Sequence, residues 1–482
     1  MSTVPPTAGA VAPGGLPGQA PADGRLVSSR GPLVSASMAL VAAISYAGAL
    51  VLAHLLAAPA YSEYAAAATL LGTVGVFAAA LVPMPLTHVI RTHPRRSEER
   101  CRGMAFAWSV SAAGGLLAAL VTGLVTATFA RTAVVGTVAV SALVLFLASP
   151  LWGWLHGELL FVRNAVLLEV EVITRISVTV GVVLAGWGAG GALTGFVAGS
   201  LVVLLGAPRA LWRDLQWRPE VLRERARWAE TGDMALTQLI VYALIGADVV
   251  LVAALATHDA ESAGYQALST LAKAPVYVAA GSVAVAFPLL RSRQARTDHI
   301  LTTTMRSFTV LALSAAAVVA TVPRDLVLLV FPERYADSLR LLPVLAAAGV
   351  GYAALTLFTS VLLGLRAYRR CQVGLLAAVV LMPVGLLLGW RVGDVPGLAV
   401  GVALAALLAA GALWAAAAPL LPARTPARAL RALVLTGVLV ALLELARFVP
   451  PLWVAAILLL GAAVLRLLRR TDDVPTDEQE TR

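Results

Sequence analysis

The chain is a succession of apolar runs, each long enough to cross a bilayer, separated by short polar breaks. About 20 apolar residues in a helix span the hydrocarbon layer of a membrane, and runs such as 232–256 and 264–290 exceed that length. Of the 482 residues, 60% are hydrophobic and 13% are charged, whereas a soluble domain carries about a quarter charged residues. The runs also lack the alternation of polar and apolar residues that marks the strands of a membrane β-barrel. The sequence therefore predicts an all-α polytopic membrane protein.

Two lobes of six transmembrane helices each, followed by two extra helices, account for fourteen such runs. The N-lobe covers 33–212, a cationic cytoplasmic linker covers 213–231, and the C-lobe covers 232–420. The extra pair covers 432–468, an acidic cytoplasmic tail follows over 471–482, and residues 1–32 are predicted to form a disordered cytoplasmic tail. The expected spans are 33–58, 65–90, 104–130, 132–156, 165–187, 189–212, 232–256, 264–290, 307–331, 339–364, 371–391, 396–420, 432–448 and 450–468.

The positions of the basic residues predict how these helices are oriented. With the N-terminus inside and each span reversing the side, 28 of the 36 Lys and Arg residues fall inside, 6 fall outside, and Arg175 and Lys273 lie within the membrane. Cytoplasmic loops are enriched in basic residues, so both termini are predicted to be cytoplasmic and the protein to lie in the cell membrane. The net charge of +10 comes from these loops, so no nucleic-acid partner is expected.

The runs 232–256 and 264–290 carry the charges that most need an explanation. Asp248 lies in the first run, and Lys273, the only lysine of the chain, lies in the second at a similar expected depth. A charge at membrane depth costs about 2.5–3.5 kcal/mol on insertion scales, so it marks a functional or structural role. Lys273 shares one helical face with Gln266, Ser269, Thr270 and Tyr277. One interpretation is a transport cavity lined by both charges, and the other is a neutralised pair that holds two helices together.

A second pair of intramembrane charges lies in the predicted span 165–187. Glu171 and Arg175 are four residues apart with the acid first, which is the favourable order for an ion pair within a helix. Arg175 either completes this local pair or faces the cavity and contacts an anionic substrate, for which its planar guanidinium is suited. Asp248 and Glu171 are the candidate ion-coupling or cavity carboxylates. The chain shows no metal-spaced cluster, no nucleotide-binding loop and no large outer loop, so neither a cofactor nor an enzymatic activity is expected.

An internal repeat links the two lobes. Residues 64–70 read YAAAATL and residues 265–271 read YQALSTL, and each segment opens the second helix of its lobe. The offset of the two segments is about the length of six helices. Two six-helix halves in the same orientation predict a pseudo-twofold axis along the membrane normal.

Three segments resemble the polysaccharide flippases of the multidrug/oligosaccharidyl-lipid/polysaccharide exporter (MOP) superfamily. They are LAHLLAAPAYSEYAAAATLLGTVGVF, GADVVLVAALATHDAESAGYQALSTLAKAPVYV and FPERYADSLRLLPVLAAAGVGYAAL. The resemblance implies alternating access that carries an isoprenoid-pyrophosphate-linked oligosaccharide or polysaccharide precursor across the membrane. It implies that Arg175 and Lys273 contact the pyrophosphate, and that polysaccharide-assembly proteins are partners. Lipid II flippases resemble the chain less, because the span 33–58 has no charge between Leu33 and Ala53.

Two other functions stay open. A drug or cation antiporter of the same superfamily would use Asp248 as its proton or sodium site, although the cationic Lys273 at the same depth argues against it. A membrane-bound polysaccharide-assembly enzyme would need a larger outer loop or domain than the sequence provides.

Overall fold

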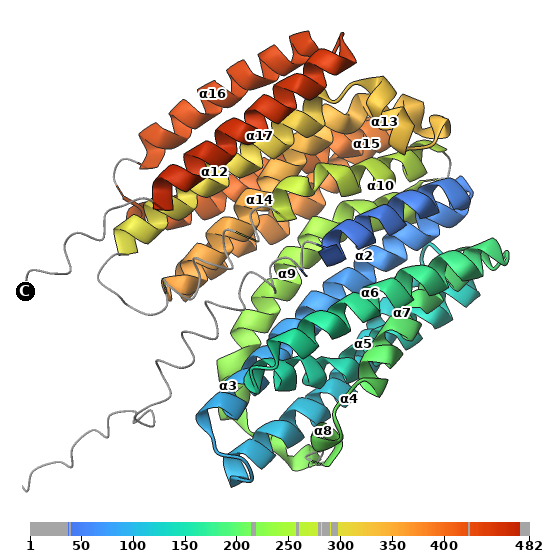
Figure 1. Cartoon of the computed structure of the whole chain (residues 1–482), viewed down its shortest axis with the longest axis vertical. Helices are drawn as coiled ribbons and strands as arrows, with labels where there is room; N and C mark the ends of the chain where they lie inside the picture. The colour runs from blue at the N-terminus through green and yellow to red at the C-terminus, as the bar shows by residue number, and fades with distance from the viewer. Residues whose placement is uncertain are drawn as a thin grey trace, which may run out of the picture.

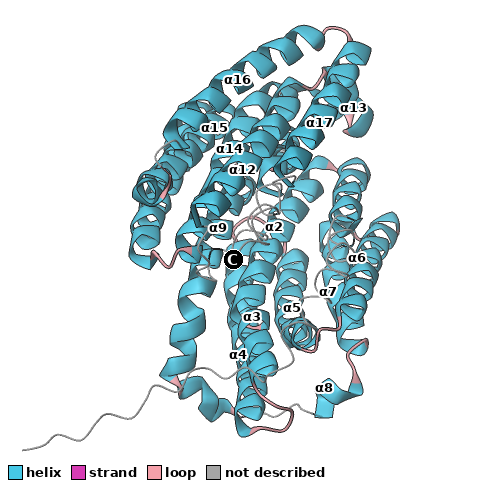
Figure 2. Cartoon of the chain, turned by 60° about the vertical axis from the view of Figure 1, so that its left-hand side comes forward, coloured by secondary structure: helices cyan, strands magenta, loops and turns pink. Residues whose placement is uncertain are grey.

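The structure is a computed structural model that describes residues 40–213, 218–256, 260–277, 297–422 and 425–472, together with residues 37, 281 and 290. The predicted tail 1–32, nearly all of the tail 471–482 and residues 282–289 of the predicted span 264–290 lie outside the described residues. All regular structure within the described residues is helical (Figures 1 and 2).

The helices follow the predicted runs closely. The N-terminal half holds a helix over Leu40–Leu55, α2 (Ala58–Leu81), α3 (Pro83–Thr92), α4 (Glu98–Thr126), α5 (Thr132–Gly157), α6 (Phe161–Leu184), α7 (Gly188–Leu205) and α8 (Arg209–Arg213). After the 3-10 helix η1 (Pro219–Arg223), the C-terminal half holds α9 (Arg225–Leu255), α10 (Ala260–Ala272), α12 (Thr297–Thr321), α13 (Arg324–Val330), the 3-10 helices η2 (Glu333–Leu341) and η3 (Ala418–Leu420), α14 (Leu342–Gly364), α15 (Tyr368–Ala417), α16 (Thr425–Ala446) and α17 (Pro450–Asp472). Helix α9 begins at Arg225, within the linker predicted over 213–231, and its apolar stretch begins at Thr231.

The helices form two groups, one from each half of the chain (Figure 1). Helices α4, α5, α6 and α7 pack on one another, as do α12, α14 and α15. The groups meet where α9 packs along α2, and α10 also contacts α2. Buried apolar residues of both groups form one continuous core across this junction. The extra helices α16 and α17 pack on α12, where the indole nitrogen of Trp453 donates to the hydroxyl of Thr321 at 3.3 Å.

Proline residues set two helix boundaries that the apolar pattern does not reveal. The predicted span 65–90 is divided at Val82, because Pro83 begins α3 as a separate helix. The predicted span 307–331 is likewise divided, since α12 ends at Thr321 and Pro323 precedes α13. Proline lacks an amide hydrogen and its ring clashes with the preceding turn, so a helix ends or begins at such a residue.

Helix α15 is a hairpin of two helices and not a single rod. Fifty helical residues would be about 75 Å long, far more than a bilayer requires. The chain turns at Gly393 and at Asp394, whose φ of 47° is left-handed. A Cβ atom on Gly385 would overlap the backbone of Gly401, so the two arms approach at backbone distance. The turn separates the two spans predicted over 371–391 and 396–420.

Eight helical stretches among the described residues are long and apolar enough to cross a membrane, judged by length and composition alone. The α15 hairpin counts as one of these stretches. The outer surface of the bundle carries many large apolar side chains that are exposed, such as Leu404 and Leu435. Such a surface is suited to contact with lipid. The architecture is therefore that of a multi-pass membrane protein, as the sequence predicts.

Candidate functional site

The carboxylate of Asp248 is buried in the middle of the protein. It projects from α9, its residue is 1% exposed, and it accepts hydrogen bonds from the hydroxyls of Tyr265 at 3.1 Å and Ser269 at 2.9 Å. Its other oxygen, Oδ1, lies 3.0 Å from Nζ of Lys273. A buried charge is stable only when it is paired and hydrogen-bonded, and Asp248 meets both conditions.

Lys273 lies at a break in its helix. The α-helix α10 ends at Ala272, although the apolar run predicted a helix over 264–290. Pro275 explains the break, because it cannot donate a backbone hydrogen bond and its ring crowds the preceding turn. The ammonium also lies 5.6 Å from the ring centroid of Tyr352, within range of a cation–π interaction. The break could have been read from the sequence, since Pro275 follows Lys273 by two residues.

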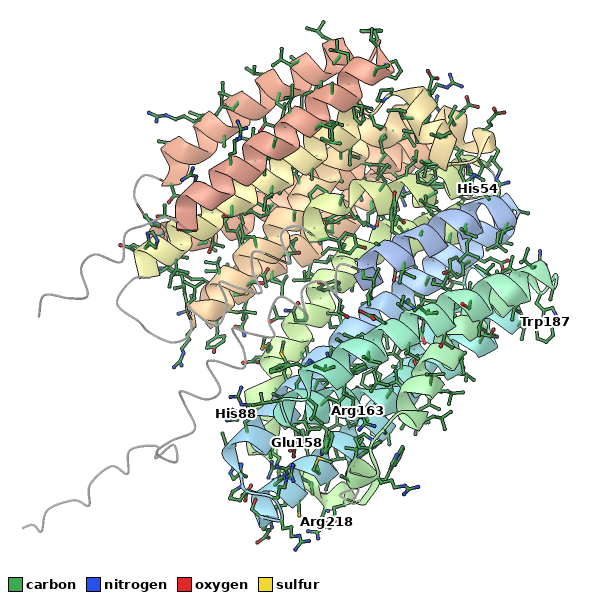
Figure 3. The ribbon with its side chains drawn as sticks, viewed as in Figure 1. His54, His88, Glu158, Arg163, Trp187 and Arg218 are labelled. Carbon is green, nitrogen blue, oxygen red and sulfur yellow. The ribbon has the colours of Figure 1, made fainter. Side chains whose placement is uncertain are left out.

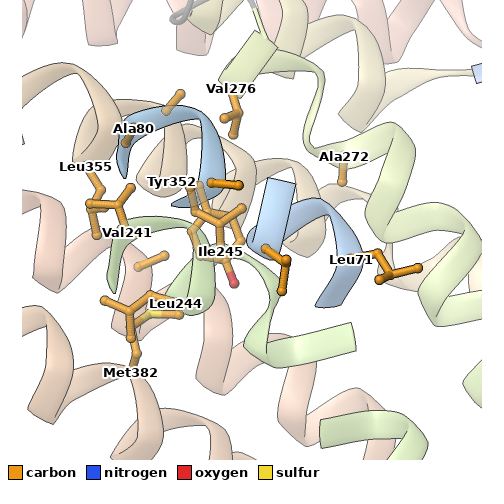
Figure 4. Close-up of a cluster of buried hydrophobic side chains, with 14 of the residues drawn as sticks. Leu71, Ala80, Val241, Leu244, Ile245, Ala272, Val276, Tyr352, Leu355 and Met382 are labelled. Carbon is orange, nitrogen blue, oxygen red and sulfur yellow. The ribbon is translucent and has the colours of Figure 1, made fainter. Parts of the chain in front are cut away.

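A glycine of α14 packs closely against the end of α10 at this break. A Cβ atom on Gly349 would overlap the carbonyl oxygen of Ala272, so only glycine leaves room for this carbonyl. Tyr352 also belongs to a cluster of buried hydrophobic side chains from several helices, among them Leu71 of α2, Ile245 of α9 and Met382 of α15 (Figure 4). The ion pair is therefore largely shielded from solvent, with side chains 14% and 1% exposed, and its attraction is stronger there than at the surface.

The other residues of the predicted polar stripe take different places. Gln266 is fully buried and its amide donates to the carbonyl of Val249 at 3.0 Å, which ties α10 to α9. Thr270 bonds only to the carbonyl of Gln266 within its own helix, at 3.2 Å. Tyr277 is 66% exposed. The structure thus brings Asp248, Ser269 and Lys273 together, with Gln266 beside them, while Thr270 and Tyr277 make no contact with this carboxylate within the described part of the chain.

The second charged pair lies in the N-terminal group. Nε of Arg175 lies 3.2 Å from Oε1 of Glu171, and both side chains are about one-fifth exposed. The guanidinium also donates to the hydroxyl of Ser45 at 3.1 Å and lies 5.0 Å from the ring centroid of Phe196. Arg175 therefore links α6 to the helix Leu40–Leu55 and to α7. No contact joins this pair to the pair of Asp248 and Lys273 among the residues that the structure describes.

The described loops that were predicted to be cytoplasmic gather at one end of the protein, here called the arginine-rich end. His88 and Glu158 lie at this end, while His54 and Trp187 lie at the other (Figure 3). Arg227 joins two of these loops, because it lies 3.0 Å from Glu99 and 2.7 Å from Glu224. Such grouping is required if the loops share one side of a membrane, as the distribution of basic residues predicts.

A cavity of about 680 Å³ opens at the arginine-rich end, between the two groups of helices. Its wall is made by α2, α3 and α4 on one side and by α9, α14 and the start of α15 on the other. The polar and charged lining residues are His88, Arg227, Thr231, Asp233, Arg366 and Tyr368. These residues could not be assigned to a site from the sequence, since they come from distant segments and the charges of Arg227 and Arg366 were explained by topology.

A partly buried carboxylate links segments of the arginine-rich end. Glu158, at the end of α5, accepts hydrogen bonds from Arg95 and Arg100. Burial by itself would raise the pKa of Glu158, but the hydrogen bonds and charges of the two arginines outweigh burial and lower that pKa. The carboxylate is therefore ionised at neutral pH and ties the loop between α3 and α4 to α5.

The opposite end is closed by contacts between the two groups. Arg334, in η2, donates to the backbone carbonyls of Ala53 and, at 2.8 Å, of Leu56, which lie at the end of the helix Leu40–Leu55. The rings of Tyr61 and Tyr335 lie 6.1 Å apart across the same boundary. A cation at the C-terminal end of a helix is favourable, because the carbonyls there lack partners within the helix. The protein is thus open at the arginine-rich end and closed at the other.

Comparison with known proteins places the fold. No family model matches the chain, and no curated protein matches its sequence. Its structure is similar to that of the lipid II flippase MurJ in an inward closed conformation, with a TM-score of 0.69 at 13% identity over 91% of this chain and 98% of that one. It is also similar to an inward-facing multidrug resistance MATE transporter of the MOP superfamily, with a TM-score of 0.52 at 14% identity over 81% of this chain and 94% of that one. A eukaryotic MATE transporter matches with a TM-score of 0.55 at 14% identity over 86% of this chain and 98% of that one.

These likenesses bear on the sequence prediction in two ways. The all-helical class is confirmed, and the resemblance to MOP-superfamily proteins holds at the level of the fold. By sequence, lipid II flippases resemble the chain less than polysaccharide flippases do. The lipid II flippase MurJ nevertheless shares this architecture over 91% of the chain. At 13–14% identity the likeness concerns the fold and leaves the substrate open. The chain therefore shares its helical fold with the solved structures of MurJ and of the MATE transporters.

Proposed function

We propose that the protein is a transporter that moves an isoprenoid-pyrophosphate-linked oligosaccharide or polysaccharide precursor from the inner to the outer leaflet by alternating access. The observation that carries this proposal is the cavity of about 680 Å³ between the two helix groups, open at one end while Arg334 closes the other. Opening at one side with closure at the other is the arrangement that one state of an alternating-access cycle requires. The predicted topology places the open end at the cytoplasm, where lipid-linked saccharides are made.

The charges in and behind the cavity suit an anionic headgroup. Arg366 at its mouth supplies positive charge to attract a pyrophosphate, while Arg227 already contacts two carboxylates and Asp233 limits the net charge there. Deeper in the protein, Lys273 and Arg175 each already contact a carboxylate. A pyrophosphate would therefore bind by exchange, drawing the ammonium of Lys273 away from Asp248. The carboxylate would keep the hydroxyls of Tyr265 and Ser269 as partners, which lowers the cost of that exchange.

The remaining residues of the predicted site take supporting roles in this proposal. Gln266 holds α10 against α9, Thr270 lies beside it, and Tyr277 is exposed on the continuation of the same helix. Glu171 keeps Arg175 in position. Membrane lipids, polysaccharide-assembly proteins and a coupling proton or sodium ion are the expected partners, and the cell membrane is the expected location, with both termini in the cytoplasm.

The antiporter alternative is less well supported by the geometry. An antiporter that uses Asp248 needs a carboxylate that is free to take a proton or a metal cation. Here both oxygens of that carboxylate are occupied, one by the ammonium of Lys273 and the other by two hydroxyls. A tethered cation thus occupies the position that a free cation would need.

Deletion of the gene tests the proposal. The mutant should accumulate a lipid-linked saccharide at the inner leaflet, detected by mass spectrometry of extracted lipids, and a plasmid copy of the gene should remove it. A plasmid copy carrying Gly411→Ala, a change at a site where a Cβ atom meets no other atom within 4 Å, serves as a matched variant that should complement fully. An unchanged lipid profile together with a new sensitivity to cationic drugs would support the antiporter instead.

A further inference from the structure

The outer arginines gather around a second cavity. The positive-inside rule explains why the predicted outer segments hold so few basic residues, but it does not explain where those few lie. Four of the six predicted outer arginines line one cavity of about 680 Å³, namely Arg324, Arg334, Arg340 and Arg447. They come from α13, η2 and the turn between α16 and α17, so their meeting is a product of the fold.

The acidic residues at this cavity do not balance its arginines. Only two carboxylates, Glu261 and Asp337, line it. Glu261 lies 2.7 Å from Arg340, and Glu444 pairs with Arg447 from outside the lining. Arg334 donates to backbone carbonyls, which carry no net charge. Arg324 is exposed and has no ion pair within the described part of the chain. The cavity therefore carries a surplus of positive charge and one guanidinium that is available to a ligand.

Exposed apolar side chains flank the same cavity. Phe448 follows Arg447 directly and is 80% exposed, and Leu329 of α13 is also 80% exposed. Two helices that pack in the membrane-spanning bundle, α12 and α14, end or begin at the cavity, since Val322 and Leu342 line it. Positive charge beside exposed apolar surface at the end of membrane helices is the arrangement that receives a phosphate headgroup while its acyl chains stay in the bilayer.

We propose that this cavity binds the phosphate headgroup of an anionic phospholipid of the outer leaflet. Arg324 and Arg447 would donate to the phosphate oxygens, for which the guanidinium is the best-suited side chain. Phe448 and Leu329 would lie against the acyl chains. The apolar flank favours a lipid over free phosphate, because a soluble anion gains nothing from exposed phenyl and leucyl side chains. The site does not depend on which substrate the protein transports.

Native mass spectrometry and thermal unfolding of the purified full-length protein test this site. Phosphatidylglycerol is titrated into detergent micelles, with phosphatidylcholine and inorganic phosphate as comparison ligands. The wild-type protein should retain one tightly bound phosphatidylglycerol and unfold at a higher temperature with it than with either other ligand. The double variant Arg324→Gln/Arg447→Gln should lose the retained lipid and need about tenfold more phosphatidylglycerol for the same shift, the loss expected for charge-assisted hydrogen bonds.

The matched control is Arg391→Gln, which removes a predicted outer arginine that does not line the cavity and has no ion pair among the described residues. This control should behave as the wild type. Equal loss of lipid in the pocket variant and in this control, or equal stabilisation by phosphatidylcholine or inorganic phosphate, would overturn the proposal. If the pocket variant does not fold, Arg324→Gln alone carries the same comparison, because Arg324 has no ion pair to break among the described residues.

Discussion

Nζ of Lys273 lies 3.0 Å from Oδ1 of Asp248, so the one lysine of the chain is neutralised by a carboxylate of the preceding helix. The sequence allowed either a substrate-binding cation or a structural pair. The geometry makes these two roles compatible, because Asp248 has two further hydrogen-bond donors that remain if Lys273 moves. The following predictions separate these roles and test the contacts around them.

Replacing each partner of this ion pair, alone and together, distinguishes substrate binding by Lys273 from a purely structural role of the pair. Lys273→Ala or Asp248→Asn alone should destabilise the protein by about 3–5 kcal/mol, the cost of leaving one buried group unpaired. The double variant should recover most of the stability in thermal unfolding. It should still fail to transport, because the cation that meets the pyrophosphate is gone. A double variant that transports normally would exclude Lys273 from substrate binding and leave Arg175 as the intramembrane contact.

Arg334 is expected to control closure of the outer end. Arg334→Gln removes charge-assisted bonds to two carbonyls at the end of the helix Leu40–Leu55, which are worth about 1.5–3 kcal/mol each. The equilibrium should shift towards outer opening by at least about tenfold, seen as faster amide hydrogen exchange over residues 53–61. Arg340→Gln in the same 3-10 helix is the control, because Arg340 pairs only within the C-terminal group. Equal exchange in both variants would show that Arg334 does not hold this end closed.

Gly349 should tolerate no side chain. A Cβ atom there would overlap the carbonyl oxygen of Ala272, so Gly349→Ala should force α14 away from α10 and destabilise the protein by about 1–3 kcal/mol. Gly136→Ala, where a Cβ atom meets no other atom within 4 Å, should be neutral or slightly stabilising because alanine favours the helix. The melting temperatures of the two variants in detergent test this prediction. Similar melting temperatures for both variants would mean that α10 and α14 do not pack this closely.

Glu158 predicts a dependence of stability on pH. Its pKa in the folded protein is lower than in the unfolded chain, where a glutamate has a pKa of about 4.3. Its contribution to stability is therefore complete above that value and is lost as the pH falls through the folded-state pKa. Glu158→Gln should lower the melting temperature at pH 7, and its difference from the wild type should vanish at low pH. Glu98→Gln, which removes an exposed pair with Arg102, should have little effect at any pH.

The predicted topology can be tested by two reporter fusions, one on each predicted side of the membrane. An enzyme that is active only outside the cell should be silent when fused after residue 482 and active when inserted after Asp394, at the turn of the α15 hairpin. The reason is the excess of arginine in the segments predicted to be inside. Activity of the C-terminal fusion would reverse the assignment of the two ends.

The sequence by itself determined the features that depend on local composition. Partition into a membrane is a property of each run of about 20 residues, so the helices and the all-helical class could be predicted one segment at a time. The pair of Glu171 and Arg175 was equally accessible, because four residues make one turn of helix. The pair of Asp248 and Lys273 could be expected once the two runs were joined by a short loop and compared in depth.

Only the tertiary structure decided which distant segments meet. The bond from Arg334 to the carbonyl of Leu56 joins residues 278 positions apart, and no periodicity in the sequence encodes it. Arg227 and Arg366 line one cavity because α9 and the start of α15 converge there, although each had already been explained by topology. The role of Gly349 could not be predicted from the sequence, because it depends on the close contact with the carbonyl of Ala272 in another helix. Such contacts depend on how whole helices pack, which is fixed by shape complementarity summed over the bundle and not by any short stretch of chain.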